Sequence, residues 1–164
     1  MSEDADSAVA ALQERVRKAA QDGEVLAITG GDTKSFLGRV SLGTPCSVRA
    51  VQGVVHYEPT ELVVTVRAGT SLTELESTLG QSGQMLPFEP PAFGEGATIG
   101  GTIACGLSGP CRPYRGAARD FVLGVRCING KGESLRFGGE VMKNVAGYDA
   151  VSYTHLTLPT NREV

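Results

Sequence analysis

Apolar residues at the start of the chain recur at helical spacing. Over residues 4–20 one face carries Val9, Leu12, Val16 and Ala19, and the charged side chains fall off that face. A stripe of this kind buries one side of a helix and leaves the other side in water. The pattern therefore predicts an amphipathic helix over 4–20.

Later apolar runs are shorter and predict strands. The predicted strands are 24–28, two stretches around Gly53 within 48–57, 62–66, 121–128 and 133–137. The run at 62–66 is nearly all β-branched, which favours a strand most strongly. The turn Asn129-Gly130-Lys131-Gly132 joins the last two strands into a predicted hairpin.

A second helix is predicted after Ser71, which is a good N-cap residue. Glu74, three residues later, completes a capping box, and Leu72, Leu75 and Leu79 give the helix a buried face. Helices and strands are thus mixed without a regular βαβ rhythm, and this order predicts an α+β fold.

The Pro- and Gly-rich stretch 85–96 is the best candidate for a boundary between subdomains. We expect a first subdomain over 1–90, which includes the N-terminal helix. The start of a second subdomain is expected over 91–149.

Composition narrows the functional classes. The net charge is −3 and no run of Lys or Arg exists, which argues against nucleic-acid binding. No apolar run approaches the roughly 20 residues that span a bilayer, and the start of the chain is acidic and polar, so a cytoplasmic location is expected. The four Cys and two His lack metal-site spacing, so no metal is expected. The 22 Gly are about twice the usual share.

The glycines gather in three stretches that are candidates for binding a phosphate. In the first, Thr29 to Ser35, Gly30 and Gly31 allow a turn whose N–H groups form an anion-binding nest, and Lys34 adds positive charge. Asp32 argues against an anion unless its carboxylate points outward. An ordinary turn explains this stretch equally well.

The second stretch is Thr98-Ile99-Gly100-Gly101-Thr102. Thr98 can cap a short helix and leave free N–H groups at its start, where an anion is stabilised. Close helix packing through small residues is the alternative explanation. Neither this stretch nor the first matches the dinucleotide motif G-x-G-x-x-G or the phosphate loop G-x-x-x-x-G-K-[ST].

The third stretch runs from Gly106 through Ser108-Gly109 to Arg115-Gly116. Ser108 offers a hydroxyl, and Arg112 or Arg115 is able to pair with a phosphate. A surface loop with solvated arginines is the alternative explanation.

Together and in this order, the three stretches resemble the FAD-binding fold of the vanillyl-alcohol oxidase and p-cresol methylhydroxylase family. The family's pyrophosphate-binding turn is matched by Thr29-Gly30-Gly31-Asp32-Thr33-Lys34. Its T-I-G-G segment is matched by Thr98-Ile99-Gly100-Gly101, and the contact continues in the family through an S-G…R-G…D segment, here Ser108-Gly109, Arg115-Gly116 and Asp120. The resemblance implies a p-cresol methylhydroxylase-type FAD-binding domain of two subdomains, incomplete at its C-terminus.

Stretches 87–91, 106–120 and 141–149 resemble one branch of this family, the FAD-binding E subunits of bacterial glycolate oxidases. The resemblance covers residues 1 to about 149. It implies oxidation of a 2-hydroxy acid such as glycolate, with a sister FAD subunit and an iron–sulfur subunit as partners. The flavin would carry the redox chemistry and the protein would position it.

The same resemblance leaves alternatives open. The chain is either a flavin-holding partner or part of the substrate-oxidising centre, and we name no catalytic residue because the family's substrate groups lie mostly in a later domain. A self-contained flavoenzyme of the D-lactate dehydrogenase type and a flavin-free binding module are the other candidates.

Two departures from the family pattern lead to further expectations. Family members with covalent flavin carry a His in or beside the first Gly-rich turn, but 29–35 contains none, so the FAD is expected to be non-covalent. Residues 150–164 turn abruptly Thr-rich and lose their glycines. They resemble vector read-through, so we expect a non-native tail after a truncated domain.

Overall fold

The structure is a computed structural model that describes residues 2–40 and 42–140, with side chains from residue 6 onward. Its elements are α1 (Ser2–Asp22), β1 (Leu26–Thr29), β2 (Thr44–Ser47), β3 (Val54–Glu58), β4 (Val63–Val66), α2 (Leu72–Gly80), α3 (Ile99–Cys105), α4 (Arg112–Arg115), β5 (Gly124–Ile128) and β6 (Ser134–Gly138). Short 3-10 turns lie at Pro59–Glu61 and Ala118–Phe121. The expectations for 141–149 and for the tail at 150–164 fall outside the described residues.

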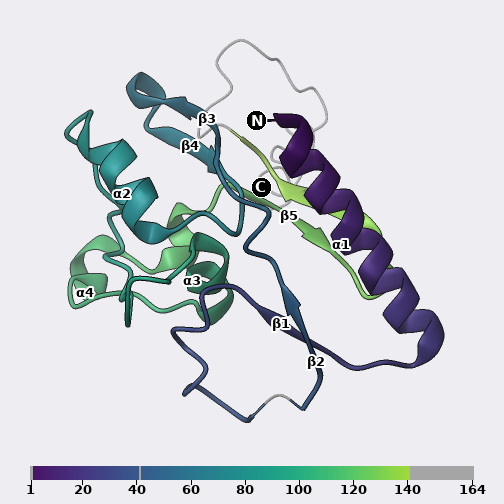
Figure 1. Ribbon diagram of the computed structural model, residues 1–164. Helices are drawn as coiled ribbons and strands as arrows, with labels where there is room; N and C mark the ends of the chain where they lie inside the picture. Colours follow the sequence, from purple (N-terminus) through teal and green to yellow (C-terminus); the bar gives the residue numbers. More distant parts are fainter. Residues whose placement is uncertain (1, 41, 141–164) are drawn as a thin grey trace, which may run out of the picture.

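The described strands form three separate two-stranded sheets. β1 pairs with β2 in parallel, whereas β3 with β4 and β5 with β6 pair antiparallel. The predicted hairpin at 121–137 is present as β5 and β6, and the mixture of helices and strands confirms the α+β class. Figure 1 shows α2, α3 and α4 gathered on one side, with α1 running along the other.

The hydrophobic core lies between α2, α3 and the β3–β4 sheet. Its buried members are Leu72, Leu75, Leu79, Ala97 and Ile99. The leucines are the face that the sequence predicts for the second helix. This cluster joins residues on both sides of the predicted boundary at 90, and the division into subdomains stays a prediction.

Helix α2 begins where the sequence places it. The Ser71 side chain accepts a hydrogen bond from the Glu74 N–H at 3.1 Å, and the helix ends at Gly80. Only this half of the expected capping box is present among the described contacts. A single side-chain cap already satisfies one of the N–H groups that a helix start leaves open.

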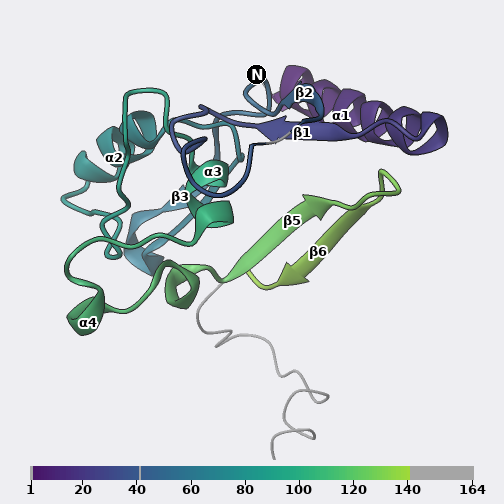
Figure 2. The same ribbon diagram turned by 90° about the horizontal axis from the view of Figure 1, so that it is seen from below.

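Helix α1 contacts the tip of the β5–β6 hairpin. Gln13 Nε2 and Arg17 Nη2 both donate to the carbonyl oxygen of Gly132, at 3.0 and 3.2 Å. A Cβ on Gly132 would lie 2.5 Å from Arg17 Cγ, so this turn approaches the helix as closely as glycine allows. Figure 2 shows the hairpin reaching under α1. None of the described helices is long and apolar enough to cross a membrane.

An ion pair joins α1 to the short segment that leads into β1. Arg15 donates two hydrogen bonds to the Glu24 carboxylate, at 2.6 and 2.7 Å. These bonds, together with one from Thr44, lower the pKa of Glu24 from 4.5 to about 2. Because the folded-state pKa is lowered, Glu24 stabilises the fold above pH 4.5, and the contribution is lost as the pH falls from 4.5 toward 2.

We therefore expect Glu24→Gln to lower the thermal midpoint at pH 7 and to lower it progressively less as the pH falls below 4.5. Thermal unfolding of both proteins by circular dichroism from pH 7 to pH 2 measures this difference. Glu14→Gln is the control. Glu14 also pairs with an arginine, Arg17 at 3.3 Å, but this pair is exposed to solvent and contributes little to stability. A difference independent of pH would show that the Arg15–Glu24 charge pair contributes nothing.

Candidate functional site

The first Gly-rich stretch leaves β1 as a tight turn whose backbone donors lack partners in the described part of the chain. Among the described residues, the N–H groups from Gly30 to Lys34 find no hydrogen-bond acceptor, whereas the Ser35 N–H returns to the Asp32 carbonyl at 3.4 Å. Asp32 is exposed and has a φ of 58°, a left-handed value that is uncommon outside glycine. Successive free N–H groups around a left-handed residue form an anion-binding nest.

The second stretch packs directly against this nest. A Cβ on Gly31 would lie 1.5 Å from the Gly96 carbonyl oxygen, and a Cβ on Gly30 would lie 2.5 Å from Thr98 Oγ1. The same Thr98 oxygen accepts the N–H of Gly101 at 3.2 Å and so caps α3. The structure thus brings the first two predicted stretches together, and both contacts need a residue without a side chain.

The expected free N–H groups at the start of α3 are not found, so this part of the sequence prediction is wrong. The Ile99 N–H donates to the Thr70 carbonyl and the Gly100 N–H to the Ala68 carbonyl, each at 2.9 Å. The next N–H is the one that the Thr98 side chain caps. The carbonyl groups between β4 and α2 accept these N–H groups and thereby hold α3 in place. The N–H groups without a partner among the described residues are therefore those of the first Gly-rich stretch.

The glycines of α3 differ in their surroundings. A Cβ on Gly100 would lie 2.7 Å from both the Cβ and the carbonyl oxygen of Ala68, so packing alone requires glycine there. A Cβ on Gly101 would meet only Thr98 Oγ1, at 3.2 Å. Thr102 is fully buried, and its hydroxyl has no partner in the described part of the chain. Gly101 is therefore the less crowded of the two α3 glycines, and a side chain there would need only a small shift of Thr98 Oγ1.

Lys34 places a cation at the edge of the nest. Its side chain is 9% exposed, and its Nζ lies 5.9 Å from the centroid of the Phe93 ring. Phe93 also meets Phe36 edge to face at 5.2 Å. No carboxylate of the described residues lies within ion-pair distance of Lys34. A buried lysine with no counter-charge among the described residues favours a bound anion beside it.

The third stretch lies beyond the far end of α3 and uses most of its polar groups within the chain. The Gly109 N–H donates to the Phe88 carbonyl at 2.9 Å, and Ser108 Oγ accepts the Ala118 N–H at 3.0 Å. Arg115, predicted as a phosphate contact, lies 3.7 Å from a carboxylate oxygen of Glu89. Gly116, with a φ of 102°, ends α4.

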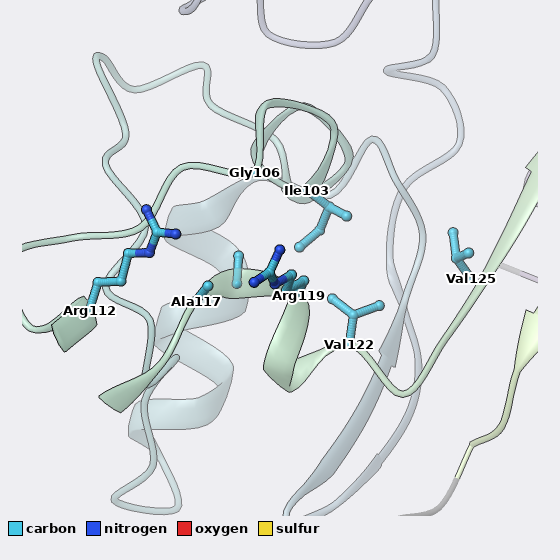
Figure 3. Close-up of a pocket in the computed structure, with 8 residues that line it drawn as sticks. Ile103, Gly106, Arg112, Ala117, Arg119, Val122 and Val125 are labelled. Carbon is cyan, nitrogen blue, oxygen red and sulfur yellow. The ribbon is translucent and has the colours of Figure 1, made fainter. Parts of the chain in front are cut away.

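A hollow of about 440 Å³ opens beside the C-terminal end of α3. Its lining residues are Ile103, Gly106, Arg112, Ala117, Ala118, Arg119, Val122 and Val125. Figure 3 shows the Arg112 and Arg119 side chains at this hollow together with the apolar Ile103 and Val122. Apolar walls with a few charged groups are typical of pockets that take a flat organic ring.

Sequence reasoning missed Arg119 and Val122 as candidate site residues. Arg119 directly precedes Asp120, the last member of the S-G…R-G…D segment, so the motif pointed to its neighbourhood. The Asp120 carboxylate itself accepts the Ala117 N–H at 2.7 Å and shapes the turn that carries Arg119. Within 2–40 and 42–140, no group of three His, Cys, Asp or Glu side chains is arranged to hold a metal.

The nest and the hollow lie at opposite ends of α3, whose seven residues span about 10 Å. Thr98 caps the helix beside the nest, and Gly106 ends it with a φ of 62° beside the hollow. An anion site and a ring-sized pocket at this separation fit a dinucleotide, which joins phosphates to flat rings. The residues of the chain therefore fit FAD.

Comparisons with known proteins also point to FAD. A family described as "FAD binding domain" matches residues 7–138. The chain is 58% identical over 139 residues to glycolate oxidase subunit GlcE of Escherichia coli strain K12, covering 85% of this chain but only 40% of that protein. It is 28% identical over 112 residues to D-2-hydroxyglutarate dehydrogenase of Xanthomonas citri, covering 68% of this chain and 23% of the relative.

Solved structures with the same fold are more distant in sequence. An alkyldihydroxyacetonephosphate synthase aligns with a TM-score of 0.61 at 22% identity, covering 77% of this chain and 24% of that one. Phl p 4, a grass pollen allergen with glucose dehydrogenase activity, aligns with a TM-score of 0.66 at 16% identity, covering 79% and 27%. These similarities show the fold alone. Because the family match spans most of the described residues, the chain belongs to the FAD binding domain family.

Proposed function

We propose that the chain holds FAD along α3, with the pyrophosphate in the nest and the flavin ring in the hollow. The nest contributes the N–H groups of residues 30–34 and the charge of Lys34. The first turn of α3 contributes Gly101, whose missing side chain keeps the space beside Thr98 and the nest open. The observation that carries this proposal is the direct contact between the two Gly-rich stretches beside a buried lysine that pairs with no carboxylate of the described residues.

We propose that residues of the third Gly-rich stretch shape the end of the site that holds the flavin ring. Ser108, Gly109, Arg115 and Gly116 fix the loop whose Arg112 and Arg119 line the hollow. The FAD is non-covalent in this proposal, because 29–35 offers no His for a covalent bond.

We further propose that the whole protein serves as an FAD-binding subunit of a complex that oxidises 2-hydroxy acids such as glycolate. The 58% identity to a glycolate oxidase subunit supports this assignment. A sister FAD subunit and an iron–sulfur subunit are the proposed partners. Bound flavin supplies the hydride-accepting chemistry, and the residues of this chain bind and orient it.

A self-contained flavoenzyme is the second candidate. The chain is 32% identical over 95 residues to a mitochondrial D-lactate dehydrogenase of Arabidopsis thaliana, but this match covers only 58% of the chain. Activity on glycolate or D-lactate of the full-length protein, alone and with candidate partner subunits, separates the two proposals. Turnover without any partner favours the self-contained enzyme.

Replacing Lys34 with Met tests the nest. The variant keeps the stem that packs near Phe93 and removes the charge, so we expect the dissociation constant for FAD to rise by about 10- to 100-fold, the usual range for a hydrogen bond to a charged group. Quenching of FAD fluorescence on titration measures the affinity. Lys131→Met, at the exposed hairpin turn, is the matched control and should bind FAD like the unchanged chain. Equal affinities for both variants would place the phosphate elsewhere.

A further inference from the structure

The segment that precedes the third Gly-rich stretch holds an unusual residue at its centre. Glu89 has a φ of 46°, a left-handed conformation that a residue with a long side chain rarely adopts. A Cβ on Gly109 would lie 2.5 Å from the Glu89 carbonyl oxygen, so the third stretch packs directly on this strained backbone. Strained residues persist where the surroundings fix them, and they gather at functional sites.

The Glu89 carboxylate contacts both ends of the short helix α4. One oxygen accepts the N–H of Cys111, the N-cap residue just before the helix, at 3.2 Å, and the other lies 3.7 Å from Arg115 Nη1 at its end. Cys111 offers no side-chain cap of its own. A carboxylate supplied from outside at a helix N-terminus satisfies an open N–H group and interacts favourably with the positive end of the helix.

Neighbouring contacts reinforce this attachment. Phe88 is buried, and its ring stacks on Phe121 with centroids 6.0 Å apart. Met85 Sδ lies 3.7 Å from Arg115 Nη1. The stretch from Met85 to Glu89 thus holds both sides of the loop that carries Arg112 and Arg119 to the hollow.

We infer that Glu89 is a positioning residue that holds α4 and thereby sets Arg112 at the flavin end of the site. Helix α4 is only one turn long and depends on outside contacts for its stability. Arg112 is its first residue and lines the hollow. This inference rests on the proposed FAD site, because it assigns Arg112 a contact with the flavin ring in the hollow.

Cys111 provides a readout of the Glu89 contact that needs no flavin. The hydrogen bond to Glu89, with burial, raises the pKa of the Cys111 thiol above its ordinary value. Glu89→Gln removes the negative charge, so the thiolate fraction at pH 8 should rise. In a Cys105→Ser, Cys127→Ser background, we expect iodoacetamide to modify Cys111 at least about threefold faster in the Glu89→Gln variant, because the thiolate is the reactive form.

The positioning role itself is tested by a double-mutant cycle on FAD affinity in the full chain. Glu89→Gln and Arg112→Ala are each expected to raise the dissociation constant about tenfold, since both remove or misplace a charged contact. If Glu89 acts through Arg112, the double variant should bind FAD no more weakly than Arg112→Ala alone. Glu76→Gln, from the neighbouring surface of α2, is the matched control and should change neither measurement.

The results of these two experiments separate the positioning role of Glu89 from the proposed FAD site. Additive losses in the double variant would overturn the positioning role, and so would an unchanged alkylation rate of Cys111 in Glu89→Gln. If the unchanged chain takes up no FAD while the alkylation rate rises as expected, the proposed function fails and the Glu89 contact stands. Should Glu89→Gln lose its circular dichroism signal, Arg115→Met breaks the same attachment from the other side and is expected to give the same non-additivity with Arg112→Ala.

Discussion

An aspartate in place of Gly101 is expected to weaken FAD binding strongly while the chain still folds. Gly101 lies in the first turn of α3, where an acidic residue stabilises a helix through its dipole. Its Cβ would lie 3.2 Å from Thr98 Oγ1, an atom that also faces Gly30 in the nest, so the new carboxylate would stand beside the proposed pyrophosphate. Two unit charges 4 Å apart at an effective dielectric of 20 repel by about 4 kcal/mol.

The expected result is a dissociation constant at least ~100-fold higher, since about 1.4 kcal/mol corresponds to a factor of ten. Isothermal titration with FAD and circular dichroism at matched concentration measure affinity and fold. Gly101→Asn has nearly the same volume and no charge, so it should lose far less affinity than the aspartate. An equal loss in both variants would assign the effect to space and not to charge, and unimpaired binding by Gly101→Asp would remove α3 from the site.

The second large effect concerns the fold. Gly31→Ala places a methyl group 1.5 Å from the Gly96 carbonyl oxygen, a contact that no side-chain rotation relieves because both groups belong to the backbone or to Cβ. The turn at Gly31 and the segment at Gly96, which leads into the second Gly-rich stretch, must then move apart. We expect a loss of about 3 kcal/mol in the free energy of unfolding, at the upper end of the usual cost of overpacking.

Urea denaturation of the full chain followed by circular dichroism measures this loss. Gly80→Ala is the matched control, because nothing lies within 4 Å of a Cβ at that position and alanine favours the helix. Gly80→Ala should be neutral or slightly stabilising. If Gly31→Ala matches it, the contact between the two stretches is not a fixed part of the fold. The same geometry makes a bulky residue at position 31 a poor probe of FAD binding, because it would disrupt the fold first.

Local pattern determined the elements whose stability comes from neighbouring residues. The stripe over 4–20 gave a helix that extends over Ser2–Asp22, and Ser71 caps α2 as predicted. The hairpin formed around the predicted turn at 129–132, where Gly132, with a φ of 74°, supplies the left-handed residue that such a loop needs. In each case the residues that determine the element lie within about one helical turn or one pair of strands.

The elements that sequence reasoning missed depend on distant partners. β2, Thr44–Ser47, has no apolar run, and it is a strand because it pairs in parallel with β1. Helix α4 is a single turn that Glu89 contacts at both ends. Neither shows in a local pattern, since a strand edge or a helix cap supplied from elsewhere leaves no periodicity in the segment that it stabilises.

The sequence by itself determined the family and the three Gly-rich stretches, because glycines that allow close backbone approach leave a readable motif. Only the tertiary structure decided which N–H groups remain free. At α3 they are taken by the Thr70 and Ala68 carbonyls, whereas from Gly30 to Lys34 they have no acceptor among the described residues. Hydrogen-bond partners far apart in the chain are set by packing, and for that reason motif reading alone placed the anion site at both turns.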